Sequence, residues 1–441
     1  MNTTMTNQKK KIAVFVISTL TAFNAYTQEV TIDAEYRPRA ELRSGYSKPL
    51  LKDDAPDLLM MQRVRLNAAY RSKLINANLS IQDARIFGEA NAKGEAVSDK
   101  IDAPKLGIYE AWAELVLPKG FAFRIGRQAL SYDDQRLISK CNWSNTGSAH
   151  DLALLTYQFK DFKANVGYAY NNSNSNPTTS DYDYGTNAFY RTMAYLWLQN
   201  NFGKSGWRVS AIAISEGFQQ KEVKEDESVD YFNSYKYTYG GNVEFKRKDF
   251  PFSAYATAYA QSGKTNTNIK LNAFLLALKL NYELCKSFTF TGGIDFYSGT
   301  DKDINTKEKT HTFSGLYGSN HSFNGAMDYW SPGALPTGGL LDLYLSAQYV
   351  VNPKVTLLGT FHSFRLAKEM NVGSDKKGLG NELDLDVSYQ FCKIANVKAG
   401  WSAYFDKDLT KLVKKVKGET RFSQWAYLSL TITPQFFSYK K

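Results

Sequence analysis

The chain has 441 residues, of which 43% are hydrophobic, 14% aromatic and 22% charged. Its mean hydropathy of −0.41 argues against a bundle of transmembrane helices, and beyond the N-terminal segment no apolar run reaches the roughly 18 residues that a spanning helix needs. The formal net charge of +11 favours anionic partners. Three widely spaced cysteines predict neither a disulfide framework nor a zinc site, and we expect no cofactor.

Residues 1–27 predict a Sec-type signal peptide. Three lysines, Lys9 to Lys11, precede the apolar stretch 12–23, which is too short to cross a bilayer. Small residues before Thr27 and Gln28 predict cleavage near that point, and no nearby cysteine marks a lipoprotein. We therefore expect an exported chain in which residues 28–441 form a single domain.

From residue 30 onward, apolar and polar residues alternate with the period of a β-strand. In residues 382–390, for example, every second residue is apolar and the others are polar. We expect about 18 strands, an even number as in single-chain bacterial barrels. The predicted strands are 30–43, 63–71, 74–87, 108–115, 121–126, 151–159, 162–170, 188–199, 207–215, 234–246, 251–261, 271–283, 288–298, 340–350, 355–366, 380–391, 396–405 and 421–433.

The connectors between these segments alternate between short and long. The short ones are 72–73, 118–120, 160–161 and 352–354, and the long ones include 88–105, 131–150, 171–187, 216–233, 299–339 and 407–420. Short turns on one side and long loops on the other are typical of a membrane barrel, and closure leaves no strand edge unpaired in lipid. The sequence therefore predicts an all-β, transmembrane antiparallel barrel in the outer membrane, monomeric, with periplasmic turns, extracellular loops and a lipid-facing exterior.

Charged residues of both signs occupy the strand faces that we predict to line the lumen. The basic ones are Arg37, Arg39, Arg43, Arg63, Arg65 and Arg124, and the acidic ones are Glu41, Glu110, Glu114, Glu382, Asp384 and Asp386. One interpretation is a ladder of ion pairs that stiffens the wall of a general diffusion porin. The other is an anion-conducting pore, because arginines select anions and bind carboxylates in bidentate fashion. The two interpretations are compatible.

Two other functional classes find little support. His150 lies near Ser148 and Asp151, but adjacent residues do not by themselves form a catalytic triad, and no nucleophile elbow is present. An outer-membrane barrel enzyme therefore stays a minor alternative, and we expect no enzyme. Nucleic acid is not an expected partner, because the basic residues alternate with acidic ones along strands instead of forming a basic patch.

Several segments resemble the alginate export family of outer-membrane barrels. The resemblance begins with residues 126–128, 134–137 and Trp143, and continues at 83–85, 293–295, 298–299, 317–328, 380–384 and 399–405, over most of the mature chain. It implies a barrel of about 18 strands that passes an anionic uronate polymer, with long loops folded over or into the pore. Carried over residue by residue, it implies lumen contacts at Asp83, Arg85, Glu110, Arg127, Arg136, Glu382 and Asp384.

The C-terminus departs from the pattern of this family. Such barrels usually end on an aromatic residue, whereas here Phe436 and Phe437 are followed by the four residues 438–441. The assembly signal of such barrels is therefore imperfect in this chain. The resemblance also leaves the substrate open between alginate itself and a related anionic polysaccharide or solute.

Overall fold

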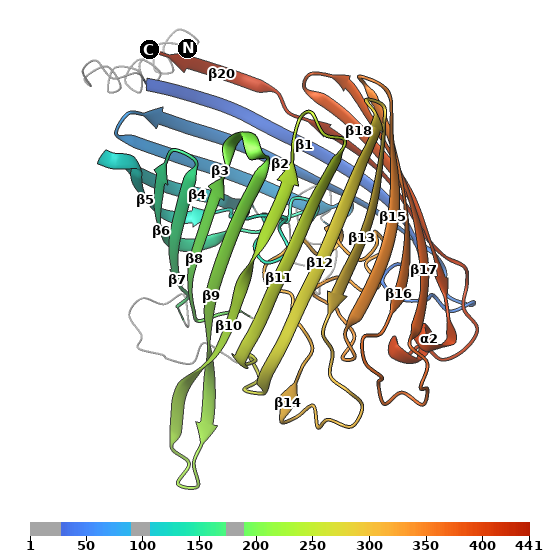
Figure 1. The fold of residues 1–441 in the computed structure, drawn as a ribbon. Coiled ribbons are helices and arrows are strands. Elements are labelled where there is room, and N and C mark those ends of the chain that lie inside the picture. Colours follow the sequence, from blue (N-terminus) through green and yellow to red (C-terminus); the bar gives the residue numbers. More distant parts are fainter. Residues whose placement is uncertain (1–27, 90–105, 173–188) are drawn as a thin grey trace, which may run out of the picture.

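The computed structural model describes residues 28–89, 106–172 and 189–441, so the predicted signal peptide lies outside the described residues. The chain forms a closed antiparallel β-barrel of 18 strands, as the sequence predicts (Figure 1). The wall strands in the first half are β1 (Gln28–Ser44), β2 (Asp57–Ser72), β3 (Ile75–Ile86), β4 (Gly107–Val116), β5 (Phe121–Gln128), β6 (His150–Phe159), β7 (Phe162–Tyr170), β8 (Thr192–Asn201) and β9 (Trp207–Val223). Those in the second half are β10 (Val229–Lys246), β11 (Phe252–Lys264), β12 (Lys270–Cys285), β13 (Phe288–Tyr297), β15 (Leu340–Asn352), β16 (Val355–Arg365), β17 (Gly378–Cys392), β18 (Ala395–Asp406), β19 (Ser423–Ile432) and β20 (Gln435–Lys440). β19 and β20 pair with successive parts of β1 and together form the eighteenth strand of the wall.

Shorter elements lie in the connections. The two-residue β14 (Lys309–Thr310) pairs in parallel with the start of β12, within the long loop that follows β13. Three single 3-10 turns are η1 (Pro118–Gly120), η2 (Gly203–Ser205) and η3 (Asn320–Ser322), and the one-turn helix α2 (Asp408–Val413) lies in the loop that follows β18. None of the helices in the described ranges has the length and apolar character of a membrane span.

The barrel closes where β1 pairs with β2 on one side and with both β19 and β20 on the other. The sequence predicted one final strand ending at residue 433, but the chain continues past Pro434 as β20. The register of β19 against β1 continues through Pro434, whose carbonyl accepts from the Ala34 N–H, to Gln435 opposite Asp33, and then shifts by one residue so that Phe437 lies opposite Ile32. Beyond the shift, Phe437 faces Ile32 and is 48% exposed on the outer surface, so the C-terminal aromatics belong to the lipid-facing wall.

A second correction concerns the predicted loop 216–233. Most of it is strand, because β9 runs to Val223 and β10 starts at Val229, and the two pair along their whole length. This hairpin projects beyond the other strands at the loop end of the barrel (Figure 1). The alternation of buried and exposed side chains holds as far as Phe218 and Gln220, whereas residues 221–223 are all exposed, so the projecting end of the hairpin lacks the period-2 pattern of a wall strand.

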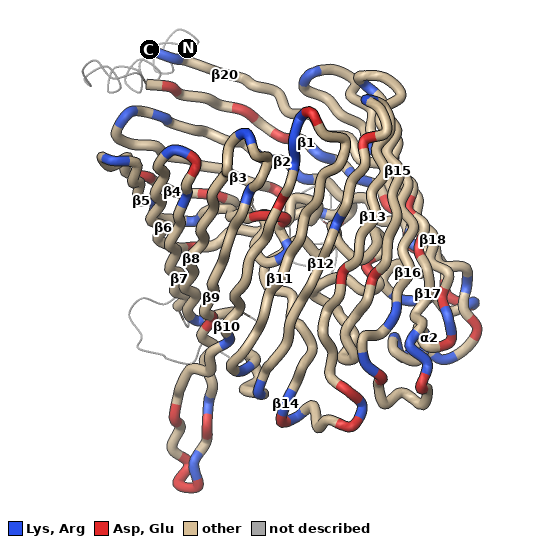
Figure 2. Tube along the Cα trace, viewed as in Figure 1, with Lys and Arg blue, Asp and Glu red and all other residues tan. Residues whose placement is uncertain are grey.

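The two faces of the wall have the character that the sequence predicts. The outer face is apolar, with Leu66 44%, Ile125 58% and Leu345 69% exposed, and such a band needs lipid around it. Figure 2 shows that the long strand segments are mostly uncharged and that Lys, Arg, Asp and Glu concentrate at turns, loops and lumen. Gln28 and Lys441, the first and last of the described residues, lie side by side at the end that carries the short turns, where the Lys441 N–H donates to the Gln28 carbonyl at 2.9 Å (Figure 1). The chain is therefore an outer-membrane barrel with short periplasmic turns and long extracellular loops.

This topology predicts which loops reach the cell surface. An epitope tag inserted at Asp303, in the loop between β13 and β15, should be labelled by antibody on intact cells. A tag inserted at Lys354, in the turn between β15 and β16, should be labelled only after the outer membrane is permeabilised. Labelling in the opposite order would contradict the orientation of the barrel.

Candidate functional site

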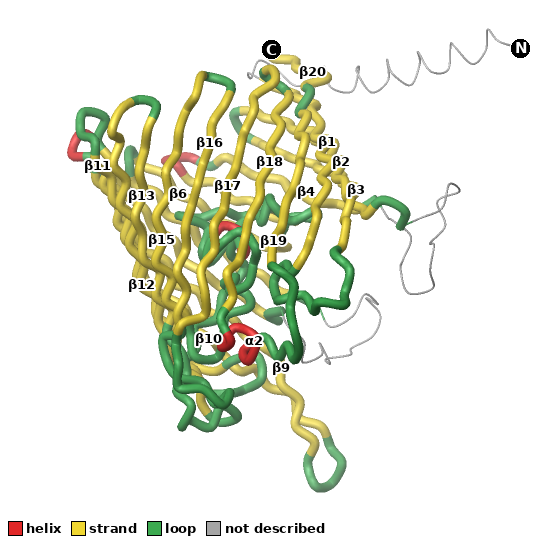
Figure 3. Tube along the Cα trace, turned by 90° about the vertical axis from the view of Figure 1, so that its right-hand side faces the viewer, coloured by secondary structure: helices red, strands yellow, loops and turns green. Residues whose placement is uncertain are grey.

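Two long loops fold inward and occupy the middle of the barrel, among the strands (Figure 3). They are residues 129–149, which follow β5, and residues 313–334, which precede β15; we call them together the plug. Backbone hydrogen bonds join them, from the Tyr317 N–H to the Leu137 carbonyl at 2.9 Å and from the Ser139 N–H to the Tyr317 carbonyl at 2.8 Å. Ile138, Met327, Tyr329 and Trp330 within the plug are at most 1% exposed. The two loops therefore pack as one body.

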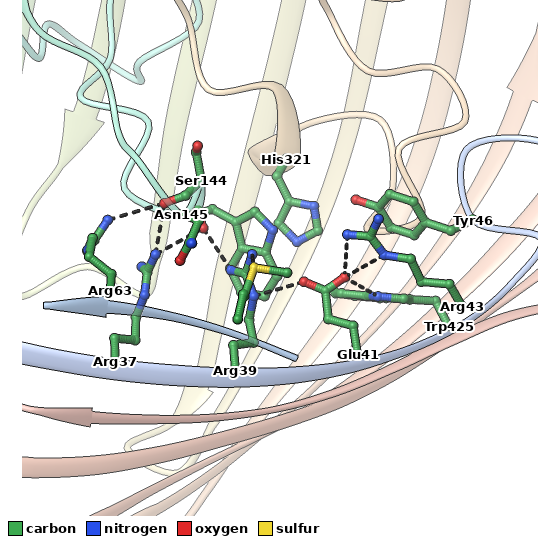
Figure 4. Close-up of polar contacts among 12 residues, drawn as sticks. Arg37, Arg39, Glu41, Arg43, Tyr46, Arg63, Ser144, Asn145, His321 and Trp425 are labelled. Carbon is green, nitrogen blue, oxygen red and sulfur yellow. Dashed lines mark hydrogen bonds and ion pairs between the residues drawn. The ribbon is translucent and has the colours of Figure 1, made fainter. Parts of the chain in front are cut away.

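Four inward-facing arginines of β1 and β2 hold the plug by its backbone carbonyls, and Figure 4 shows three of them, Arg37, Arg39 and Arg63. We call Arg37, Arg39, Arg63 and Arg65 the arginine clamp; each is at most 8% exposed. Arg37 donates to the carbonyls of Asn142 at 2.5 Å and Ser144 at 2.8 Å, and Arg39 donates to the carbonyl of Trp143 at 2.7 Å. From β2, Arg63 donates to the carbonyl of Ser144 at 3.2 Å and Arg65 donates to the carbonyl of Thr146 at 3.0 Å. Hydrogen bonds from a charged donor are stronger than neutral ones, so the clamp fixes residues 142–146 against the wall.

The clamp arginines also have partners on the wall itself. Arg63 donates to Glu35 at 2.7 Å, and the Arg39–Glu41 ion pair is 2.8 Å long. The ion-pair ladder that the sequence predicts is thus present at these positions. Since both carbonyls and carboxylates already occupy the guanidinium groups, the clamp does not present a ring of free cations to a passing solute.

Aromatic rings tie the two loops to each other and to the wall beside the clamp. Trp143 of the first loop stacks on His321 of the second loop, with ring centroids 4.1 Å apart. The guanidinium of Arg39, on the wall strand β1, lies 4.2 Å from the centre of the Trp143 ring. Trp425 and Tyr427 of β19 meet the Trp143 ring edge-on at 5.9 and 5.0 Å. Trp143, part of the motif that suggested the family, is therefore the point where both loops and the wall meet.

Arg136 anchors the opposite side of the plug. Its guanidinium bonds both oxygens of Asp295 on β13 at 2.8 Å, the Tyr297 hydroxyl at 2.8 Å and Asp134 at 2.7 Å. Burial lowers the pKa of Arg136, but the Asp295 and Asp134 carboxylates outweigh burial and hold the pKa well above its ordinary value. Arg136 lies in the lumen as expected, with its charge compensated.

Two carboxylates of β17 complement the clamp, because they accept from backbone N–H groups of the plug. Glu382 accepts from the Met327 N–H at 2.7 Å, and Asp384 accepts from the Ala326 N–H at 3.3 Å. Gly325 makes this approach possible: its φ is +85°, and a Cβ there would lie 2.6 Å from the Glu382 carboxylate. Wall cations of β1 and β2 thus hold carbonyls of one plug loop, and wall anions of β17 hold N–H groups of the other plug loop.

The remaining predicted lumen residues divide between plug anchors and wall pairs. Glu110 accepts from the Ala129 N–H at 2.9 Å, where the plug begins. Glu114 pairs with Arg124 at 2.7 Å. Asp386 accepts from the Tyr427 hydroxyl at 2.7 Å, and Arg43 pairs with Glu41 at 2.8 Å near the loop end of β1.

Three residues carried over from the family resemblance do not face the lumen. Directly opposed residues of antiparallel strands share a face; Asp83 is opposite Val64, which is 39% exposed on the outer surface, and Arg85 is opposite Gln62 on that same face. Arg127 is opposite Ala111 and Asp151 and pairs with Asp151 at 2.8 Å, also outside. Short motifs did not fix the register, and a shift of one residue moves a side chain to the other face.

Tyr109 departs from the alternation for a related reason. The sequence placed it on the apolar face of its strand, but β4 carries a bulge between the pairs Ser80–Glu110 and Ile81–Ile108. The extra residue turns Tyr109 inward, where its ring lies 3.5 Å from the guanidinium of Arg65. Tyr109 therefore supports the arginine clamp.

The geometry around His150 does not match a hydrolase. His150 faces inward and its Nδ1 lies 2.7 Å from the Tyr190 hydroxyl, whereas Asp151 faces outward and pairs with Arg127. Since the two residues lie on opposite faces of β6, Asp151 cannot orient the imidazole as a triad requires.

Sequence reasoning missed a cavity of ≈ 560 Å³ beside the plug, on the side of β11 to β16. Hydroxyl and amide side chains on alternate strand positions line much of its wall: Thr257, Asn281, Thr291, Ser346, Gln348 and Thr360. Tyr255, Tyr344 and Lys279 add two aromatic rings and one amine. The sequence pattern that could have predicted this cavity is the run of Thr, Ser, Asn and Gln at alternate positions of these strands, whereas the predicted lumen residues were all charged.

Comparison with known proteins supports the same architecture. Residues 28–183 match the family model described as Alginate export, which confirms the resemblance over that part; the motifs after residue 183 lie outside the match. No relative was found among curated proteins.

Solved structures show similarity of fold alone. Pseudomonas aeruginosa OccK5 (OpdH) is 11% identical, with a TM-score of 0.59 and coverage of 92% of this chain and 98% of its own. The outer membrane protein OpdK of the same species is 9% identical, with a TM-score of 0.60 and coverage of 92% and 99%. Acinetobacter baumannii OccAB4 is 13% identical, with a TM-score of 0.60 and coverage of 93% and 98%.

The arginine clamp generates a prediction about the width of the pore. Arg63→Ala removes contacts with Asn142 and Ser144 and leaves Glu35 without its cation, so it should destabilise the docked plug by about 3 kcal/mol. Single-channel recordings should then show higher and noisier conductance than wild type. Arg127→Ala, which deletes the same side chain from the outer face, is the matched control and should conduct like wild type. Equal conductance of both variants would show that the clamp does not limit the pore.

Proposed function

We propose that this outer-membrane barrel is a channel for an anionic polysaccharide of the uronate class. The observation that carries the proposal is the composition of the cavity beside the plug, and the family match over residues 28–183 agrees with it. The selectivity of the channel is assigned to this cavity, and the arginine clamp is assigned to holding the plug.

The cavity wall suits a sugar chain. Hydroxyl and amide side chains such as Thr291, Asn281 and Gln348 donate and accept hydrogen bonds in the way that sugar hydroxyls require. The rings of Tyr255 and Tyr344 provide flat apolar surfaces for the C–H faces of a pyranose, and their hydroxyls stay available to polar partners.

Lys279 gives the cavity its anion preference. It is exposed in the lumen, and within the described part of the chain no carboxylate pairs with it; its ammonium lies 5.9 Å from the centre of the Tyr255 ring. The other charged groups of the cavity contact one another: Arg136 bonds both Asp134 and Asp295, and His362 lies 2.8 Å from Asp342. Carboxylates outnumber cations by one in this set when His362 is protonated, and Lys279 stands apart from it as the charge without a carboxylate partner among the described residues. A uronate carboxylate that reaches this site therefore meets one unpaired positive charge.

Weak binding is what a channel needs. Two unit charges about 4 Å apart attract by ~1 kcal/mol in water and by ~4 kcal/mol at an effective dielectric of 20. A single exposed ammonium lies nearer the first value, so each sugar unit can bind and leave, as conduction through successive sites requires.

The ion pairs along the wall support a second candidate, a general diffusion porin. Arg63–Glu35, Arg39–Glu41 and Arg124–Glu114 stiffen a barrel without selecting any solute. The two candidates differ in whether charge and sugar matter for passage.

Planar-bilayer recordings separate the two candidates. Wild type should prefer chloride over potassium, and added oligouronate should reduce its current. Lys279→Glu should weaken or reverse the chloride preference and lower the sensitivity to oligouronate by roughly tenfold, about 1.4 kcal/mol. Lys204→Glu, in the periplasmic turn between β8 and β9, makes the same charge change outside the cavity and should leave both properties unchanged.

A wild-type channel without ion preference and without response to oligouronate would reduce the protein to a general porin. If both variants shifted selectivity equally, the preference would arise from overall charge and not from the cavity.

A further inference from the structure

A cluster of basic side chains lies at the extracellular rim, above the ends of the wall strands. We call it the basic rim: Arg365, Lys376, Lys377, Lys407 and Lys411 line a hollow of ≈ 730 Å³ where β16, β17 and β18 end. Only two acidic residues, Asp406 and Asp408, line the same hollow. Basic segments gather around α2 at this end of the barrel (Figure 2).

Pairing across the strands places the Arg365 side of the hollow on the outer face, whereas Asp406, two residues beyond the inward-facing Tyr404, and the buried Leu409 line its inner side. Phe364 and His362 of β16 point inward and are buried, so Ser363 and Arg365 between and beyond them point outward. Arg365 is directly opposite Gly378 on β17, and a Cβ on Gly378 would lie 3.2 Å from the Lys407 amine. Arg365 and Lys407 therefore face the surroundings of the barrel.

The cations of the rim lack acidic partners. Within the described residues, Lys411 approaches Asp406 at 3.8 Å, but no ion pair joins Arg365, Lys376, Lys377 or Lys407 to a carboxylate. The neighbouring loop shows the usual alternative, because Lys302 there pairs with both Glu369 and Asp375 at 2.9 Å. Unpaired like charges in one hollow repel one another, so an anion bound between them would relieve a cost of the empty state.

The backbone that carries the rim is well anchored. In α2, Leu409 is 2% and Thr410 0% exposed, and the Thr410 hydroxyl donates to the Leu379 carbonyl of β17. The Leu366 N–H donates to the Lys377 carbonyl at 2.8 Å, which closes the loop between β16 and β17. The basic groups are thus held on a fixed frame.

Exposed apolar side chains border the rim on its membrane side. Phe361 lies four residues before Arg365 on the same face of β16, about 13 Å away along the strand, and is 45% exposed. Phe405 and Phe422 are 47% and 51% exposed with ring centroids 5.8 Å apart, and Leu412 of α2 is 43% exposed. Such side chains belong in acyl chains and at the headgroup boundary, so the cations above them stand at headgroup height.

We propose that the basic rim binds the phosphorylated headgroup of a glycolipid in the outer leaflet. Phosphate oxygens would be shared among Arg365, Lys376, Lys377 and Lys407, while the acyl chains would lie against Phe361, Phe405 and Phe422. The combination of unpaired cations and an adjoining apolar band on the outer face selects a lipid over the soluble polymer, which has no acyl chain to cover these rings.

The test measures binding of bis-phosphorylated lipid A to the full-length barrel in detergent by native mass spectrometry. Wild type should bind it at least about tenfold more tightly than dephosphorylated lipid A, since basic groups near an anionic lipid surface add affinity. The variant Arg365→Gln/Lys376→Gln/Lys377→Gln/Lys407→Gln should lose this difference. The variant Lys376→Arg/Lys377→Arg/Lys407→Arg, which keeps the charge, should retain it.

The matched control is Lys204→Gln/Lys248→Gln/Lys286→Gln/Lys393→Gln, which removes four charges from the periplasmic turns and should bind like wild type. A shift in gel mobility on heating reports that each variant is a folded barrel. Wild-type binding by the glutamine rim variant would overturn the proposal. Displacement of the lipid by inorganic phosphate or oligouronate at equal concentration would also overturn it, assigning the rim to a free anion or to the polymer.

Discussion

The interior of this barrel depends on hydrogen bonds between wall arginines and backbone carbonyls of the plug. A wide barrel cannot fill its lumen with wall side chains alone, so loops must fold inward if the pore is to be narrow. A loop in the lumen buries carbonyls that need donors. The arginine clamp supplies them from β1 and β2 to residues 142–146, while Glu382 and Asp384 of β17, three strands from β1, accept N–H groups from residues 326 and 327.

Because of this arrangement, most charged side chains in the lumen stabilise the plug and the wall and are not free to attract a solute. The inward-facing charges looked like a conduction path, but most of them support structure: Arg37 and Arg39 hold carbonyls, Arg136 is neutralised by Asp295, and Arg124 by Glu114. Neutral polar residues of β11 to β16 line the accessible cavity instead, with Lys279 in it as a charge that no carboxylate of the described residues pairs with. In the function that we propose, solute recognition and plug attachment lie on different parts of the wall.

Sequence periodicity predicted the barrel well and its interior only in part. Strand alternation and the alternation of connector lengths predicted the 18 strands and their orientation, because lipid outside and water inside impose period 2 on every strand. The end of β9, the start of β10 and the existence of β20 were missed, since exposed hairpins and a proline step interrupt the signal. The sequence placed Tyr109 on the outer face, but a bulge in β4 adds one residue and turns it inward. It placed Asp83, Arg85 and Arg127 in the lumen because short family motifs do not fix the strand register, and all three face outward. That the arginines contact loop carbonyls could not be predicted, because backbone acceptors carry no sequence signature.

Cys141 offers the most direct measurement of whether the two loops form one clamped plug. Its thiol lies 3.3 Å from the Gly318 carbonyl of the other loop, whereas Cys285 and Cys392 are exposed. Two variants are compared as folded barrels, one that retains only Cys141 and one that retains only Cys285. A charged, membrane-impermeant thiol reagent should modify Cys141 at least about tenfold more slowly than Cys285, because the reagent reaches Cys141 only when the plug opens locally, and opening costs free energy. Combining Arg37→Ala and Arg63→Ala should abolish that protection. Equal rates at Cys141 and Cys285 in the otherwise unaltered barrel would contradict a docked plug.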